Sequence, residues 1–314
     1  MPTVTPFPVD VRNLPAPLAA VPSDPPAQHV RAALDLRLRA LLRHDPGTRT
    51  GADIEDLHQM RVAVRRMRAS LKSARPLLDA AWADGLRAEL GWLGRALGPV
   101  RDLDVMLLRL RGEIAGLPER EKAAGEVLVG RLVQEHGEAR VEMLAALEAP
   151  RYTALIERLA DAIRLPLPTP SATTAQPELP ELVRVEFRKI SRAVERAGED
   201  PADEVLHALR IRAKRVRYTG ELVRSALKGT AAGVTVKKLL EATSELQEVL
   251  GDHQDACVAE QRIRELLDGL GETIDAHVVF VAGRLVERER TRADVKRGEW
   301  RAAWSAVAEH GAAL

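Results

Sequence analysis

Basic side chains and a histidine recur at helical spacing in two short segments of this 314-residue sequence. The first segment reads HQMRVAVRRMR from His58 to Arg68, and the second reads HALRIRAKRVR from His207 to Arg217. Both fit the pattern H-x-x-R-(V/I)-x-x-(R/K)-R-x-R, and they lie about 150 residues apart. Arginine forks and lysine ammonium groups at this spacing are suited to binding phosphate oxygens. The pattern therefore indicates recognition of an anion.

On an α-helix the cations of each segment share one face, since residues advance by about 100° and the first set spans a stripe roughly 80° wide. The basic stripes consist of His58, Arg61, Arg65, Arg68 and Lys72, and of His207, Arg210, Lys214 and Arg217. The adjoining apolar stripes consist of Leu57, Met60, Val64, Met67 and Leu71, and of Leu206, Leu209, Ala213 and Val216. A basic stripe beside a buried stripe is suited to the wall of a groove between packed helices.

Neither segment interleaves acidic residues with its cations: none lies between Leu57 and Lys72 or between Leu206 and Tyr218. Like charges three or four residues apart cost a few tenths of a kcal/mol each in an isolated helix. A single basic helix is usually a solvated face, but two copies with the same phase favour a binding site. Two such helices facing each other would line a channel with about ten positive charges and a focused field.

A second landmark follows each basic segment at nearly the same distance: a Leu-Gly pair, then a basic side chain and an aspartate. It consists of Leu97, Gly98, Arg101 and Asp102 in the first copy, and of Leu250, Gly251, His253 and Asp255 in the second. Internal duplication accounts for both repeats. Each aspartate could orient an arginine through an ion pair or hold Mg²⁺ beside a phosphate. The ion pair is favoured because no ligand cluster surrounds either residue in the sequence.

The elements that position these residues are predicted to be helices. Apolar residues recur at three- and four-residue steps, aromatic residues make up 3% of the chain and charged residues 30%, which favours helices packed on helices. Helices are predicted at 29–43, 53–78, 82–97, 99–113, 118–147 and 151–164, and at 182–197, 202–227, 231–250, 252–270, 274–290 and 293–310. We therefore predict an all-α fold.

Two proline-rich segments divide the chain. Residues 1–27 are predicted to be a disordered, extended tail. Residues 165–180 (LPLPTPSATTAQPELP) are predicted to link two helical halves, at 28–164 and 181–314.

These repeated residues resemble the CHAD family, the conserved histidine α-helical domain, and the resemblance covers about residues 28–310. It implies two pseudo-twofold-related four-helix bundles that enclose a basic central groove or pore. It also implies binding of inorganic polyphosphate and association with polyphosphate granules. The ligand-facing residues that it implies are His58, Arg61, Arg65, Arg66, Arg68, His207, Arg210, Lys214, Arg215, Arg217 and Tyr218. Lys72 joins them from the basic stripe, and Arg101 and His253 are weaker candidates.

Polyphosphate suits this set because it carries roughly one negative charge per phosphate and no bases, so its binder needs cations and no stacking surface. Nearby phosphate would favour the charged forms of His58 and His207, whereas the surrounding arginines would oppose them. The first copy has Ala69 where the second has Tyr218, so the two sides of a groove need not be equivalent.

Three other functions are compatible with parts of the sequence. A nucleic-acid-binding protein could use the same arginines, but few aromatic residues are present for stacking. A polyphosphate-processing phosphohydrolase would need a base or metal, and the sequence contains no Gly-rich phosphate loop, H-E-x-x-H or nucleophile elbow. A scaffold could recruit granule-associated proteins through the proline-rich tail. We expect a binding protein rather than an enzyme, with no cofactor.

The net charge of +1 means that any basic site is a local concentration. The single cysteine, Cys257, fits a reducing compartment, and the sequence has no stretch long and apolar enough to span a membrane. We expect a cytoplasmic protein located at polyphosphate granules. His253 and Cys257 lie one helical turn apart, but two ligands without a third make a weak metal site, so a packed cysteine is favoured.

Overall fold

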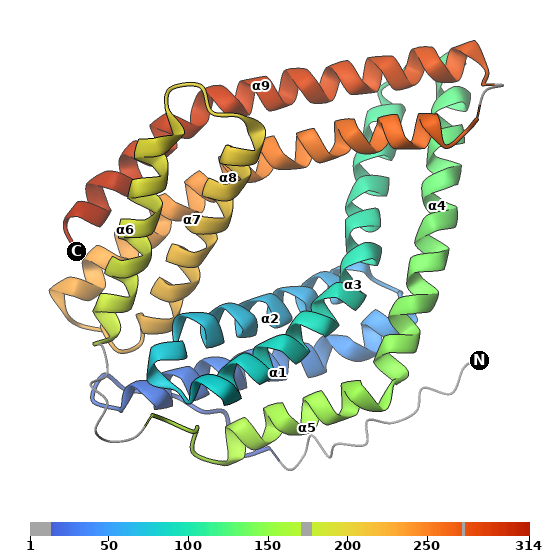
Figure 1. Ribbon diagram of the computed structural model, residues 1–314. Helices are drawn as coiled ribbons and strands as arrows, with labels where there is room; N and C mark the ends of the chain where they lie inside the picture. Colours follow the sequence, from blue (N-terminus) through green and yellow to red (C-terminus); the bar gives the residue numbers. More distant parts are fainter. Residues whose placement is uncertain (1–13, 171–177, 272–273) are drawn as a thin grey trace.

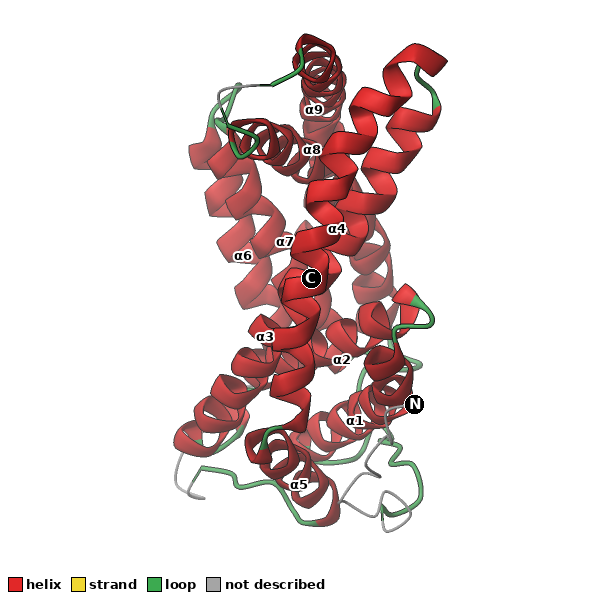
Figure 2. Cartoon of the chain, turned by 90° about the vertical axis from the view of Figure 1, so that its right-hand side faces the viewer, coloured by secondary structure: helices red, strands yellow, loops and turns green. Residues whose placement is uncertain are grey.

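The computed structural model describes residues 14–170, 178–271 and 274–314, and throughout these ranges the regular structure is helical (Figures 1 and 2). The all-α prediction is confirmed. The α-helices are α1 (Pro26–Thr50), α2 (Ile54–Ser73), α3 (Ala80–Ala115), α4 (Glu119–Glu148), α5 (Pro150–Arg164), α6 (Leu179–Ala197), α7 (Asp203–Val223), α8 (Ala231–Asp268) and α9 (Ala276–Ala312). One 3-10 turn, Arg75–Leu77, follows α2.

Each half of the chain contains a helical bundle and a long hairpin arm. The bundle of the first half consists of α1, α2, α5 and the beginning of α3. Its arm consists of the rest of α3 paired with α4. The bundle of the second half consists of α6, α7, the beginning of α8 and the end of α9. Its arm consists of the remainders of α8 and α9. Figure 1 shows these four parts as the sides of a frame.

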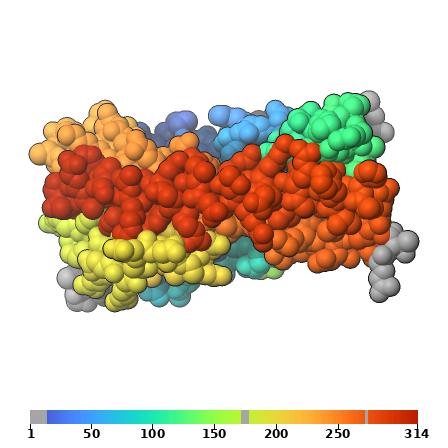
Figure 3. Space-filling model, turned by 90° about the horizontal axis from the view of Figure 1, so that it is seen from above, coloured from blue at the N-terminus to red at the C-terminus, as the bar shows by residue number. Residues whose placement is uncertain are grey.

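Two separate hydrophobic cores hold the frame together. The larger core joins the two bundles, where α7 contacts α1 and α2. The smaller core joins the two arms, where Leu128 of α4 lies with Val281 and Leu285 of α9. Figure 3 shows α9 running the length of the molecule from the bundle that contains α6 to the arm that contains α4. The two halves therefore contact each other at two places in the frame, and neither half encloses its own core completely.

Three helices are longer than the sequence predicts. The predicted helices at 82–97 and 99–113 are one helix, α3, with Pro99 inside it. The predicted helices at 231–250 and 252–270 are likewise one helix, α8. Those at 274–290 and 293–310 are one helix, α9. In α3 and α8 the prediction of breaks was wrong because proline and glycine weaken a helix locally, whereas burial on both sides of the weak point stabilises it.

The Leu-Gly landmarks lie where α3 and α8 pass from one core to the other. In α3, Val100 belongs to the larger core and Met106 to the smaller one. In α8, Leu250 belongs to the larger core and Ala259 to the smaller one. Each landmark therefore occupies the corner between a bundle and its arm.

Parts of both proline-rich segments pack on the helices. The backbone N–H of Leu18 donates to Asp35 at 2.7 Å, and Arg39 donates to the carbonyl of Pro15 at 2.5 Å. Residues 14–25 therefore lie against α1, which differs from the prediction of a disordered tail through residue 27, and residues 1–13 lie outside the described residues. In the linker, the carbonyl of Pro168 accepts from the N–H of Asp79 at 2.8 Å, and residues 171–177 are not described.

Within the described parts of the chain, none of the helices has the length and apolar character needed to span a membrane.

Candidate anion-binding site

The two basic segments form α2 and α7, and these helices pack against each other across the two halves. Ser73 of α2 and Thr219 of α7 share a hydrogen bond at 2.6 Å, and Arg66 lies 3.8 Å from Glu221. The side chain of Asp53 caps the first turn of α2 by accepting from the N–H of Glu55. Both helices are thus held in place by polar contacts at their ends as well as by packing.

Burial follows the apolar stripes that the sequence predicts. The buried side chains of these stripes are Leu57, Met60, Val64, Met67 and Leu71 on α2, and Leu206, Leu209, Ala213 and Val216 on α7. Because these residues fix the rotation of each helix, they also determine where the adjoining cations point.

Five cations from both halves then lie within electrostatic range of one another, and we call them the basic cluster. They are Arg61 and Arg65 of α2, Arg101 of α3, and Arg210 and Lys214 of α7. Arg65 is exposed and the other four are partly buried. The repulsion among them is therefore only partly screened by water.

Lys214 shows the effect of this crowding most clearly. Burial, then Arg210 and then Arg65 lower the pKa of its ammonium group from 10.5 to about 8, although Asp255 opposes the shift. Burial is also the main reason why the pKa of the Arg61 guanidinium is lowered. The charged form of Lys214 is thus less favourable than that of an ordinary lysine, although it still predominates at pH 7.

His58 borders the cluster. Burial, followed by Arg101, lowers the pKa of its imidazole, and Glu55 opposes the shift. The imidazole is therefore neutral at pH 7 unless an anion lies beside it.

Three guanidinium groups of the cluster carry buried nitrogen atoms for which the described residues provide no hydrogen-bond partner. These atoms are Nη1 of Arg61, Nη1 of Arg101 and Nε of Arg210. A buried donor without an acceptor costs about 1–3 kcal/mol. An anion with several oxygen atoms would supply the acceptors.

The repeated glycine and aspartate now have a structural explanation. A Cβ atom at Gly98 would lie 2.7 Å from Nη1 of Arg61, and one at Gly251 would lie 3.6 Å from Nε of Arg210. Gly98 therefore gives Arg61 room to cross α3, whereas a Cβ atom at Gly251 would make only an ordinary van der Waals contact with Arg210.

The aspartate that follows each glycine pairs with the same arginine. Asp102 lies 3.1 Å from Arg61, and Asp255 lies 3.6 Å from Arg210. The predicted ion pairs are present in both copies, and they orient the guanidinium groups.

A second group of predicted cations continues from the cluster toward the end of α2. Arg68 lies against Gly91 of α3, and burial and Arg95 lower the pKa of its guanidinium. Lys72 lies in the field of Arg215, and burial is the largest cause of the lowered pKa of its ammonium group. Arg68, Lys72 and Arg215 thus extend the positive charge along α2.

Three predicted residues lie elsewhere. Tyr218 is 8% exposed, and together with Arg66 it lines a pocket beside α1. Arg217 donates to Glu221 at 3.0 Å and to Gln247 at 3.2 Å. Glu221 of α7 thus pairs with both arginines, Arg217 on its own helix and Arg66 on α2.

His253 also lies outside the basic cluster, because it is not the counterpart of Arg101 in the repeat. Counting from the Leu-Gly pair, His253 occupies the place of buried Val100, and Gln254 occupies the place of Arg101. His253 is accordingly 1% exposed. Oε1 of Gln254 lies 2.7 Å from Nδ1 of His207. Gln254 is therefore a site residue that the sequence analysis missed, although an ungapped count would have found it.

The CHAD domain family model matches residues 32–264. This chain belongs to the CHAD domain family. Two uncharacterized proteins of Mycobacterium tuberculosis, from strains CDC 1551 / Oshkosh and H37Rv, are each 29% identical to this CHAD domain chain over 291 residues. The matches cover 89% of this chain and 53% of each relative, so the chain spans about half the length of these relatives.

Two solved structures are similar to this CHAD domain chain. PptA from Streptomyces chartreusis has a TM-score of 0.70 at 22% identity, and the match covers 90% of this chain and 100% of that chain. The CHAD domain from the plant Ricinus communis has a TM-score of 0.68 at 26% identity, and covers 91% of this chain and 94% of that chain. The first likeness shows the fold alone, and the second is to a structure of the same family.

The explanation for Gly98 predicts how two glycines of α3 respond to alanine. Around Gly112, the described residues leave open space for a Cβ atom, so Gly112→Ala should raise the free energy of unfolding by about 0.5–1 kcal/mol. Gly98→Ala should gain less than Gly112→Ala or lose stability, because the new methyl group displaces Arg61. Chemical denaturation measures both, and an equal gain for the two variants would contradict the explanation.

The crowding of Lys214 predicts a pH-dependent stability difference. Its pKa is lower in the folded chain than in the unfolded chain, so the unfolded state binds more protons between about pH 8 and 10.5. Lys214→Met should therefore be more stable than the native chain at pH 7, and this advantage should shrink as the pH rises through that window. Thermal unfolding at several pH values measures the difference.

Lys238→Met is the matched control for this prediction, since Lys238 is an exposed lysine on α8. It should be close to neutral at each pH. A Lys214→Met chain that is less stable than the native chain at pH 7 would refute the interpretation of crowding.

Proposed function

We propose that this chain binds inorganic polyphosphate through the basic cluster, and that the cluster lines the groove implied by the family resemblance. The observation that carries the proposal is the convergence of repelling cations from both halves, with buried N–H donors directed at no acceptor among the described residues. Polyphosphate supplies both the charge and the oxygen atoms that this arrangement lacks. The CHAD domain family is known to bind polyphosphate, which supports the proposal.

The length of the charged surface favours a chain of phosphates over a single one. From Arg61 to Lys72 the helix rises by about 16 Å, and Arg68 and Arg215 add charge along this length. A polyanion would contact the five cations of the cluster and then this extension. Affinity should therefore increase with chain length, and release of counterions should make it strongly dependent on salt.

The placement of the aromatic residues supports polyphosphate over nucleic acid. Trp92 lies under Arg151, Trp300 lies under Arg301, and Trp304 stacks on Phe187. These rings are engaged in contacts outside the cluster, whereas the cluster itself is made of arginine and lysine. Single-stranded nucleic acid is usually bound by aromatic stacking as well as by charge.

We propose binding without hydrolysis. The carboxylates nearest to the cluster, Asp102 and Asp255, already pair with arginines, so neither is positioned to activate water. A protein of this kind would reside on polyphosphate granules, and granule-associated proteins are the partners that we propose for it.

Charge reversal on each basic helix tests the proposal. Arg65→Glu combined with Lys214→Glu removes two cations, adds two anions and leaves the buried apolar stripes unchanged. We expect the affinity for long polyphosphate to fall at least a hundredfold at about 0.1 M salt, and the salt dependence of the remaining binding to be weaker. Isothermal titration calorimetry, with an assay for released phosphate, provides both readouts.

Arg120→Glu combined with Lys238→Glu makes the same change in net charge at exposed positions away from the cluster. This control should bind nearly as well as the native chain. Equal losses in the two double variants would show attraction by overall charge alone, and release of phosphate by the native chain would refute binding without hydrolysis.

A further inference from the structure

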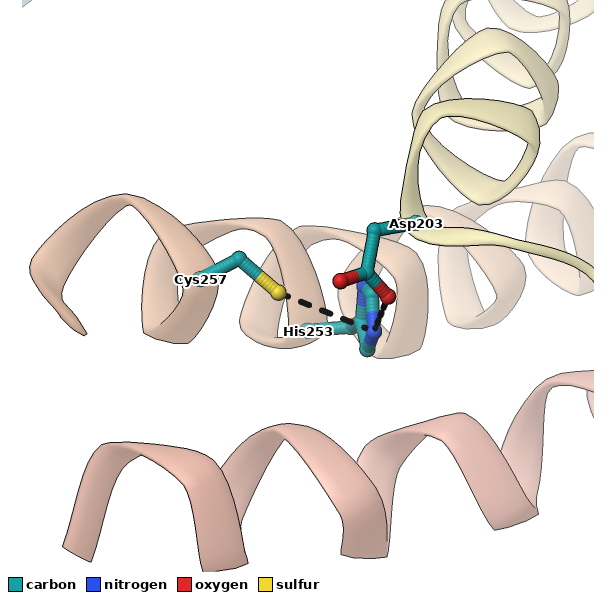
Figure 4. A group of neighbouring side chains, drawn as sticks. All are labelled: Asp203, His253 and Cys257. Atoms are coloured by element: carbon teal, nitrogen blue, oxygen red, sulfur yellow. Dashed lines mark hydrogen bonds and ion pairs between the residues drawn. The ribbon is translucent and has the colours of Figure 1, made fainter. Parts of the chain in front are cut away.

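Three side chains with metal-binding atoms meet where α7 begins against α8: Asp203, His253 and Cys257 (Figure 4). Their ligand atoms all lie within 4.8 Å of one another. Oδ1 of Asp203 is 3.1 Å from Nε2 of His253, and Sγ of Cys257 is 3.8 Å from the same nitrogen. Figure 4 shows the carboxylate and the thiol directed toward the imidazole, the former from α7 and the latter from α8.

We propose that Asp203, His253 and Cys257 bind one Zn²⁺ ion, with water as the fourth ligand. Zinc in proteins is tetrahedral, with bonds of about 2.0–2.1 Å to nitrogen, about 2.0–2.2 Å to oxygen and about 2.3 Å to sulfur. These bond lengths place nitrogen and oxygen ligands about 3.3 Å apart, and nitrogen and sulfur ligands about 3.6 Å apart. The distances between the side chains are thus within a few tenths of an ångström of two edges of a zinc tetrahedron.

The charges and the access route also suit a divalent cation. A thiolate and a carboxylate together neutralise Zn²⁺. Arg297 pairs with Oδ1 of Asp203, the oxygen that lies 3.1 Å from Nε2 of His253, so its guanidinium would keep this carboxylate beside the ion. Asp203 and Cys257 line an open pocket that also contains His207, which gives the ion and its water ligand a path from solvent.

His253 is a buried imidazole with polar contacts at one of its two nitrogen atoms. It is 1% exposed, and its Nδ1 atom has no hydrogen-bond partner within the described part of the chain. Packing and the contacts of Nε2 alone therefore orient the ring, and Nε2 faces the two other ligand atoms. From the sequence His253 and Cys257 form an incomplete pair, and folding supplies the third ligand from the first residue of α7.

The site is separate from the proposed binding of polyphosphate, because its three ligands do not belong to the basic cluster. A bound ion would fasten the first turn of α7 to α8. Since α7 carries Arg210 and Lys214, the ion would stabilise the helix that presents two of the five cations of the cluster.

The test is a titration of the untagged, metal-free full chain with Co²⁺, followed by Zn²⁺. Because Cys257 is the one cysteine of the chain, a thiolate-to-cobalt charge-transfer band can arise from this residue alone. We expect such a band at one Co²⁺ per chain, d–d absorption of tetrahedral intensity, and loss of both when one equivalent of Zn²⁺ is added. A native chain without the charge-transfer band would overturn the proposal.

Variants identify the other ligands. Cys257→Ser should lose the band, and Asp203→Asn should weaken Co²⁺ binding at least tenfold. Asp200→Asn is the matched control, since Asp200 also pairs with Arg297 but lies outside the ligand set. It should bind Co²⁺ as the native chain does, and equal binding by Asp203→Asn would refute the role of that carboxylate. Polyphosphate affinity is measured separately, so failure of either proposal is distinguishable from failure of the other.

Discussion

Repulsion among neighbouring cations is the constraint that the packing of this fold must overcome. Arg61, Arg65 and Arg210 lie within electrostatic range of Lys214, and burial together with this repulsion lowers the pKa of the lysine. Packing elsewhere must offset it. The larger core pulls α2 and α7 together beneath the cations, and the smaller core joins the arms on the far side of the frame. Stability and the proposed binding are thus separated: apolar residues position the helices, and the polyphosphate that we propose would relieve the repulsion.

The repeated segments favour an internal duplication, and the two copies differ at several positions. Both copies have a glycine beside an arginine and an aspartate that orients this arginine, although only Gly98 leaves space that a Cβ atom would fill. The first copy places Arg101 at the corner of its arm, whereas the second has Gln254 in contact with His207. The second copy also has His253 where the first has Val100, and this exchange provides the imidazole of the proposed zinc site.

The sequence predicted correctly those features of the structure that depend on the residues of one helix. Helical spacing identified the buried stripes of α2 and α7, and the repeated landmark predicted that Asp102 and Asp255 pair with arginines, although it did not name Arg61 and Arg210 as the partners. The sequence did not predict the features that depend on contacts between several helices. Pro99 weakens a helix locally, yet α3 continues through it because two cores bury its two ends. The approach of Lys214 to Arg65 and of Asp203 to Cys257 depends on packing between helices, which spacing along one segment does not reveal. The pseudo-twofold relation of the halves stays a prediction.

The central claim is that one ligand contacts both basic helices at once. A crystal structure of the chain with a polyphosphate of about ten phosphates tests it most directly. The account predicts continuous density for the ligand, with oxygen atoms in hydrogen-bond contact with Arg61 or Arg65 of α2 and with Arg210 or Lys214 of α7. Density that follows one of these helices alone, or that lies on another face of the molecule, would contradict it.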